Sequence, residues 1–304
     1  MANRWWVYQR ERFPVLAHGL LIAAFSSSAV CFSQLLRGVV EVPPPRTLLV
    51  AFGTAFLFFL QLRIADEFKD FDEDSRYRPY RPVPRGLVKL RELAIVFVLA
   101  CLIQLGLALW LEPSLFALLA ITWTYLALMS KEFFVAKWIK RRHILYMVSH
   151  MAIVPLVDFY ATACDWRPVA PRPPDGLLWF VVVSYFNGLV IEIGRKMRAP
   201  QDEEEGVNTY SALWGVRRAV IVWLGVMTAT GAFAVVAAAR IDFLLPVLVV
   251  LSLLLLGAVL CGIRLLKRRT TGKTIEGHSG VWTLALYLSL GLIPLACRLW
   301  LPTS

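Results

Sequence analysis

The chain has 304 residues, of which 58% are hydrophobic and only 17% are charged, and its formal net charge is +11. Soluble domains carry about 25% charged residues, so this composition excludes an ordinary soluble globular protein. The apolar residues fall in blocks of about 20, the length at which a helix crosses the hydrocarbon core of a bilayer. Because lipid offers the backbone no hydrogen bonds, such blocks must be helical, and the sequence predicts an all-α polytopic membrane protein.

Nine membrane spans are expected, all within one integral membrane domain that covers residues 1–304. In chain order they are predicted at about 14–36, 46–65, 91–111, 113–130, 143–161, 176–194, 218–239, 242–263 and 280–300. The stretch before the first span is too polar and too aromatic for a cleavable signal peptide. We interpret it as a segment that lies at the membrane interface.

The lysine and arginine residues predict the orientation of these spans. Of the 32, 26 fall on the side that holds the N-terminus and the loop after every even-numbered span, and six fall on the other side. The positive-inside rule then places the N-terminus in the cytoplasm, and the odd number of spans places the C-terminus outside. We expect a multi-pass protein of a cell inner membrane, with its active site facing the cytoplasm. The positive charge is therefore a signal of topology and of contact with membrane lipid, and no nucleic-acid partner is expected.

A dense cluster of charge follows the second span, in the stretch RIADEFKDFDEDSRYRPYRPVPRG at residues 63–86. If the span continues as a helix through residue 74, Asp66, Glu67, Asp70 and Asp74 share a stripe of about 100°. Carboxylates that repel one another favour a bound cation, and oxygen ligands favour Mg²⁺ with positions left for phosphate. The stiff basic segment that follows would complete a diphosphate site. A solvated acidic face paired to those arginines is the alternative.

The second polar stretch, IEIGRKMRAPQDEEEGVNTYSALWG, joins the sixth and seventh spans on the same side. Glu192 ends the sixth span, and Arg195 and Lys196 follow at i+3 and i+4 on one helical side. Taken alone, this pattern is typical of an ordinary charged loop. A helical bundle, however, can bring it against the first cluster over one cavity. Lys131, at the end of the fourth span, is a further candidate for the rim of that cavity.

Together the two stretches resemble the UbiA-type intramembrane prenyltransferase superfamily, which has nine helices around a lipid-open cavity. The family's first motif is Asn-Asp-x-x-Asp-x-x-x-Asp, followed by Arg-Pro-x-Arg-Pro-x-Pro-x-Gly. DEFKDFDED and its basic tail match in register, with Asp66 in place of the Asn and Glu67 in place of the first Asp. The second motif carries over only Asp202, because Arg195 and Arg198 stand where two family aspartates belong.

The resemblance implies a Mg²⁺-dependent enzyme that ionises an isoprenyl diphosphate and transfers the prenyl group to an aromatic or lipid acceptor. The metal ligands that it implies are Asp66, Glu67, Asp70, Asp74 and Asp202, of which Asp70, Asp74 and Asp202 would be catalytic. The diphosphate-binding residues that it implies are Lys131, Arg195, Arg198 and Arg81. The terpene-cyclase branch of the superfamily, in which the cation cyclises without an acceptor, is the alternative.

A cation transporter is a more remote alternative. The carboxylates of an ion path would lie near the middle of the bilayer. Here the acidic residues cluster at the ends of the expected spans, and we expect no Asp or Glu in the membrane interior. This distribution favours an enzyme that acts at the membrane surface on a substrate with a polar head.

Overall fold

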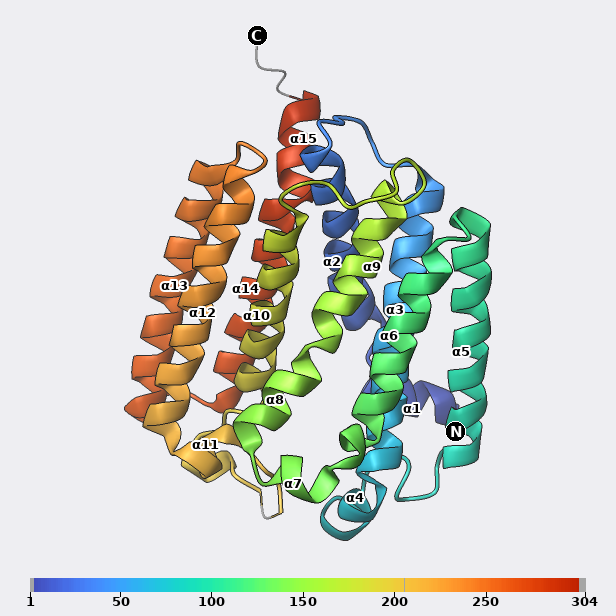
Figure 1. Ribbon diagram of the computed structural model, residues 1–304. Helices are drawn as coiled ribbons and strands as arrows, with labels where there is room; N and C mark the ends of the chain where they lie inside the picture. The colour runs from blue at the N-terminus through green and yellow to red at the C-terminus, as the bar shows by residue number, and fades with distance from the viewer. Residues whose placement is uncertain (1–2, 205, 301–304) are drawn as a thin grey trace.

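The computed structural model describes residues 3–204 and 206–300, and within these ranges the chain forms helices and loops with no strand. The predicted all-α fold is confirmed. The longer helices are α2 (Val15–Leu36), α3 (Pro45–Lys69), α5 (Leu90–Leu111), α6 (Leu115–Ser130), α8 (His143–Met151), α9 (Ile153–Trp166), α10 (Leu177–Arg195), α12 (Val216–Ala239), α13 (Leu244–Leu266), α14 (Gly272–Leu290) and α15 (Leu292–Trp300). They form one bundle (Figure 1).

The short helices gather toward one end of this bundle (Figure 1). They are α1 (Arg4–Arg12), α4 (Phe71–Tyr77), α7 (Ala136–Lys140) and α11 (Tyr210–Trp214), together with 3₁₀ turns at Glu132–Phe134 and Pro200–Asp202. Since α4 lies within the first polar stretch and α11 ends the second, the fold places both polar stretches at the same end, as predicted.

The number of spans differs from the prediction. Among the described residues, seven helical segments are long and apolar enough to cross a membrane, and the bent pair α14 and α15 makes an eighth if it is one span. The predicted span at 113–130 corresponds to α6, which has only 16 residues. That is shorter than the roughly 20 residues that a helix needs to cross the hydrocarbon core, so the count of nine is not confirmed.

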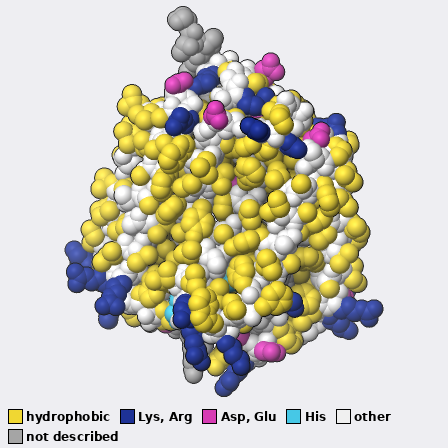
Figure 2. All heavy atoms as spheres, in the orientation of Figure 1, with side chains coloured by type: hydrophobic (Ala, Val, Ile, Leu, Met, Phe, Trp, Pro, Cys, Tyr) yellow, Lys and Arg dark blue, Asp and Glu magenta, His cyan; other side chains and the backbone are white. Residues whose placement is uncertain are grey.

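On the face shown in Figure 2, a broad apolar belt crosses the middle of the molecule, and the charged side chains gather toward its two ends. Large hydrophobic side chains are exposed along the helices of this belt, including Leu99 on α5 and Leu253 on α13. Lipid is the solvent that suits such a surface. The chain is therefore an integral membrane protein.

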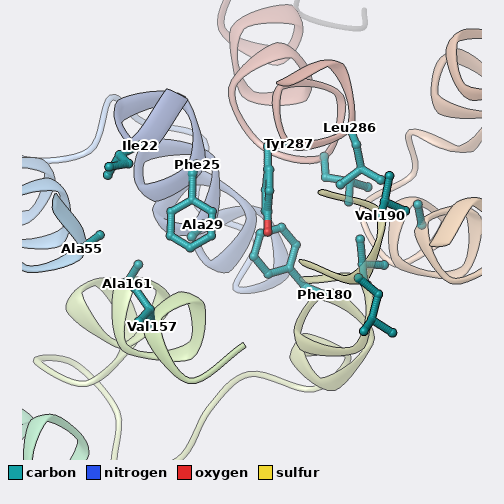
Figure 3. Close-up of a cluster of buried hydrophobic side chains, with 14 of the residues drawn as sticks. Ile22, Phe25, Ala29, Ala55, Val157, Ala161, Phe180, Val190, Leu286 and Tyr287 are labelled. Carbon is teal, nitrogen blue, oxygen red and sulfur yellow. The ribbon is translucent and has the colours of Figure 1, made fainter. Parts of the chain in front are cut away.

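The centre of the bundle is packed by α2, α9, α10 and α14. Phe32 of α2 stacks on Phe180 of α10 with ring centroids 4.6 Å apart, and Phe25 meets Tyr287 edge to face at 5.0 Å. Figure 3 shows Phe25, Phe180 and Tyr287 pointing toward one another between the helices. A small residue lets α10 and α14 approach closely, because a Cβ added to Gly194 would lie 2.1 Å from the Ser279 hydroxyl oxygen.

Two aspartates lie inside α9, so the expectation of no acidic residue in the membrane interior is wrong. Asp165 accepts hydrogen bonds from Ser33 at 2.6 Å and from Arg37 Nη2 at 2.7 Å, which ties α9 to the end of α2. Asp158 is fully buried, beside Ser184. The sequence-based span ended at residue 161, whereas the helix continues to Trp166 and carries Asp158 away from its end.

Candidate active site

The first acidic motif is divided between two helices. The continuous helix expected through residue 74 ends instead at Lys69, and Asp70 is the residue at the break, with φ −99° and ψ 8°. Helix α4 begins at Phe71 and carries Asp74. The expectation of one continuous stripe is therefore wrong for Asp74, whereas Asp66 and Asp70 keep the i, i+4 spacing that places them on one side.

Two of the predicted metal ligands are enclosed by arginines. Glu67 is almost fully buried and accepts a hydrogen bond from Arg12 Nε at 2.5 Å. Asp74, also buried, contacts Arg81 Nη1 at 2.6 Å and Arg78 Nε at 3.1 Å. Arg81 thus braces the proline-rich loop against α4. A buried carboxylate requires such compensation, because an unpaired charge away from water is costly.

The other two carboxylates of the motif are more open. The Asp66 side chain keeps 37% of its surface exposed and lies 3.4 Å from Lys69 Nζ and 3.9 Å from Arg63 Nη1. Asp70 is half-buried, and no ion pair within 4 Å is found for it in the described part of the chain. Burial raises the pKa of Asp70, Lys69 opposes this shift, and the nearby Asp66 carboxylate adds to it.

The second polar stretch supplies cations opposite this pair. Glu192, at the end of α10, is buried and contacts Arg195 Nη2 at 2.7 Å and Lys196 Nζ at 2.8 Å. Arg195 is also within electrostatic range of Asp66, although no ion pair within 4 Å joins the two among the described residues. The end of α10 thus contributes positive charge on the side of the first motif.

A contact between the two polar stretches holds them together. Gly206 adopts φ +74°, in the left-handed region that favours glycine, and a Cβ added to it would lie 2.5 Å from the ring of Tyr77 at the end of α4. On the same loop, Glu203 accepts hydrogen bonds from Thr209 at 2.6 Å and Ser211 at 2.7 Å. The loop is thus shaped to lie against α4.

Several residues of this cluster were not among the predicted site residues. Lys69 donates a hydrogen bond to Tyr146 of α8 at 2.8 Å, and Tyr146 stacks on His150 with centroids 3.8 Å apart. Lys196 lies 5.9 Å from the ring centroid of Tyr210. The spacing of Lys69 three residues after Asp66 was a signal that could have been used. Nothing in the sequence connects Tyr146 or Tyr210 with the acidic motif.

We call Asp66, Lys69, Asp70, Glu192 and Arg195 the α3–α10 cluster. For three predicted residues, no hydrogen bond or ion pair with this cluster is found among the described residues. Lys131 is exposed on the turn after α6. Arg198 points toward Glu276 of α14, with Nη1 3.8 Å from Oε2. Asp202 lies in the turn at Pro200–Asp202, and the described residues show no cluster of three or more acidic, histidine or cysteine ligands around it or elsewhere.

The two more open carboxylates, Asp66 and Asp70, suit Mg²⁺. This ion is bound by one or two carboxylates and keeps positions for water and phosphate oxygens. Asp66 and Asp70 offer that donor set, one helical turn apart. In this structure the carboxylates of Glu67 and Asp74 are paired with guanidinium groups. Of the five predicted metal ligands, Asp66 and Asp70 therefore form the pair whose carboxylates are most open to a metal.

The fold and this cluster define a class of protein: a helical integral membrane protein with a carboxylate and guanidinium site at one end of the bundle. The model of the UbiA prenyltransferase family matches residues 26–277, and the chain belongs to that family.

Comparisons with individual proteins agree with this assignment. The diterpene cyclase eriG of Hericium erinaceus is 26% identical over 198 residues, which are 63% of this chain. This match spans 61% of that relative's length. A UbiA homologue from Aeropyrum pernix K1 has the same fold, with a TM-score of 0.68, 16% identity, and coverage of 92% of this chain and 98% of its own. A digeranylgeranylglyceryl phosphate synthase superposes with a TM-score of 0.59 at 13% identity, over 96% and 99% of the two chains.

Proposed function

We propose that the protein ionises an isoprenyl diphosphate at the α3–α10 cluster, with Mg²⁺ held by Asp66 and Asp70, on the cytoplasmic side of a cell membrane. The observation that carries the proposal is the pair of open carboxylates Asp66 and Asp70 at the end of an apolar bundle, with Lys69 Nζ 3.4 Å from Asp66. Arg195 adds positive charge within electrostatic range of Asp66. A diphosphate needs both cationic donors and a metal, and its isoprenoid chain needs an apolar surface. The excess of Lys and Arg at this end supports the cytoplasmic orientation.

The chain's own residues have distinct tasks in this proposal. Bound at the open carboxylate pair, Mg²⁺ would supply positive charge that stabilises the departing diphosphate. Arg195 and Lys69 donate N–H groups to phosphate oxygens, and Glu192 holds Arg195 in position. The C1–O bond breaks, its electron pair leaves with the diphosphate, and an allylic cation remains. The apolar bundle excludes water, which would otherwise capture that cation.

Cyclisation is the fate of the cation that we favour. Double bonds of the same chain attack the cation, new C–C bonds form, and loss of a proton gives a cyclic hydrocarbon. The relative named a diterpene cyclase supports this choice, because its similarity to this chain extends over 198 residues. Transfer of the prenyl group to an aromatic or lipid acceptor is the second candidate, and the name of the matching family supports it.

The experiment is an incubation of purified protein with Mg²⁺ and geranyl, farnesyl or geranylgeranyl diphosphate, without an acceptor. Release of pyrophosphate with a cyclic hydrocarbon would establish cyclisation. Substrate that binds and stays intact until an aromatic or lipid acceptor is added would establish transfer. A protein that binds none of the three diphosphates would contradict both cyclisation and prenyl transfer. That result would favour a cation transporter, which should not bind these diphosphates.

A further inference from the structure

A groove between α8 and α11 has no role in the chemistry described so far. Its volume is 550 Å³, within the roughly 300–1,000 Å³ typical of small-molecule sites. Figure 1 shows α11 beside the start of α8, at the end of the bundle that holds both polar stretches. The residues that line the groove are Arg142, His143, Ile144, Leu145, Val148 and Trp214. Helix α8 therefore supplies most of the lining, and α11 supplies the tryptophan.

The wall formed by α8 is an apolar face. At about 100° per residue, Ile144, Leu145 and Val148 lie within about 100° of one another around the helix. Ile144 is 62% exposed and Leu145 is 37% exposed, although both side chains are large and apolar. Helix α8 begins a segment, His143–Trp166, that is long and apolar enough to cross a membrane. The groove therefore opens toward lipid at the membrane interface.

The polar end of the groove carries positive charge. Arg142 is exposed, its Cζ lies 4.1 Å from the ring centroid of Trp138, and its Nη1 donates to the Trp138 carbonyl at 3.3 Å. His143, beside it, offers a ring N–H in either tautomer. Within the described part of the chain no ion pair within 4 Å is found for Arg142 or His143, whereas the neighbouring Lys140 is paired with Glu132 at 3.5 Å. The charge of Arg142 is therefore available to an anion.

We propose that the groove between α8 and α11 binds one anionic phospholipid, with its phosphate at Arg142 and His143 and an acyl chain along Ile144, Val148 and Trp214. Charge complementarity selects this occupant. A phospholipid carries a phosphate followed by apolar chains, which is the order of groups along the groove, and basic side chains at the interface favour anionic lipids. The inference goes beyond the proposed function and does not depend on isoprenyl diphosphate chemistry.

The groove lies behind the elements that contact the candidate active site. Tyr146 is about half a turn around α8 from the groove face, and its hydroxyl accepts a hydrogen bond from Lys69 at 2.8 Å. On α11, Trp214 stacks on Tyr210 with ring centroids 4.6 Å apart, and the Tyr210 N–H donates to the Lys196 carbonyl at 2.9 Å. The lipid site is thus separate from the carboxylates that we expect to hold the metal.

The test uses the purified protein in nanodiscs of equal parts phosphatidylglycerol and phosphatidylcholine. One preparation carries a photoactivatable diazirine in the acyl chain of the phosphatidylglycerol, and the other carries it in the phosphatidylcholine. Mass spectrometry of the labelled peptides gives the ratio of labelling by the two probes at α8 and α11. We expect this ratio to exceed its value on the lipid-facing helix α5 by about fivefold or more, the preference that one basic residue gives near an anionic surface.

Two variants address the polar and apolar parts of the groove separately. Arg142→Gln should lower the labelling ratio in the groove by about fivefold. Arg269→Gln is the matched control and should leave the ratio unchanged, because Arg269 is exposed in the turn between α13 and α14 and does not line the groove. Val148→Trp fills the apolar part, so it should lower labelling of α8 and α11 by both probes. Size-exclusion profiles identify any variant that fails to fold.

Equal labelling of the wild-type groove by the two probes would overturn the inference, because the groove would then hold ordinary boundary lipid without regard to charge. An unchanged ratio in folded Arg142→Gln would overturn it as well, since the phosphate would then be bound elsewhere. The wild-type ratio depends on no variant, so it tests the inference even if a substitution prevents folding.

Discussion

Arg12 donates a hydrogen bond through Nε to Glu67 Oε1 at 2.5 Å, across 55 residues of sequence, and its Nη2 lies 3.9 Å from Asp74 Oδ2. The side chains of Glu67 and Asp74 are 1% and 2% exposed. One guanidinium from the N-terminal helix thus lies between two buried carboxylates of the acidic motif. It compensates charge that would otherwise repel, and it fixes α1 over the end of α3.

Replacing Arg12 with alanine should destabilise the protein by about 3–5 kcal/mol, the usual cost of leaving one partner of a buried ion pair uncompensated. Thermal unfolding in detergent measures the loss. Arg10→Ala is the matched control, because Arg10 is exposed on the same helix and should change stability little. The double variant Arg12→Ala with Glu67→Gln should recover much of the loss, since the neutral amide needs no counter-charge. Equal stability of all the variants would show that the pair contributes nothing.

Asp66 and Asp70 are the carboxylates that we expect to hold the metal, and Asp70→Asn tests this directly. Pyrophosphate release from an isoprenyl diphosphate should fall by about 10²–10³, the range found when one stabilising group is lost from a charged transition state. Isothermal titration should show weaker Mg²⁺ binding in the presence of a non-reactive diphosphate analogue. Asp72→Asn is the control, because Asp72 is exposed on α4.

Replacing Asp74 with asparagine tests whether Asp74 is a metal ligand or a counter-charge for Arg78 and Arg81. Asp74→Asn removes the partner of Arg81 and Arg78, so it should lower thermal stability as well as activity. Asp70→Asn should lower activity with little change in stability. A stable, inactive Asp74→Asn variant with weakened Mg²⁺ binding would mean that Asp74 turns toward the metal when substrate binds.

Local patterns allowed part of this site to be predicted, and long-range packing determined the rest. The i, i+4 spacing of Asp66 and Asp70 is a property of any helix, so it could be read directly from the sequence. The break at Asp70 could not be read from that spacing, and after it α4 carries Asp74 against Arg78 and Arg81. The pairing of Arg12 with Glu67 joins residues 55 positions apart, and no periodic pattern in the sequence predicts it.

The same distinction applies to the bundle. Apolar blocks of span length made the all-α membrane fold predictable, and the excess of basic residues correctly grouped the two polar stretches at one end. Hydropathy does not determine where a helix ends, however. Helix α6 is shorter than its apolar block suggests, and α9 continues past the predicted boundary. Asp158 already lay within the predicted span at 143–161, but its complete burial was missed.

Substitutions of Arg195 and Arg198 should differ in their effect on diphosphate binding, although both residues replace aspartates of the family motif. Arg195→Gln removes a charge within electrostatic range of Asp66, and the affinity for a non-reactive isoprenyl diphosphate analogue should fall about 10- to 100-fold. Arg198→Gln should have a much smaller effect, because Arg198 faces Glu276. Competition binding at fixed Mg²⁺ measures both. Equal losses would show that Arg198 also reaches the phosphate, as the motif alone had suggested.

Gly206→Ala should detach the second polar stretch from α4, for two separable reasons. The left-handed backbone costs a non-glycine residue about 1–2 kcal/mol, and the new methyl group would overlap the Tyr77 ring. We expect faster hydrogen exchange and proteolysis in the loop around residue 206. Adding Tyr77→Ala relieves the overlap but leaves the backbone cost, so the double variant should recover only part of the protection. Full recovery would mean that the overlap alone matters, and no change in the single variant would mean that the loop does not need this contact.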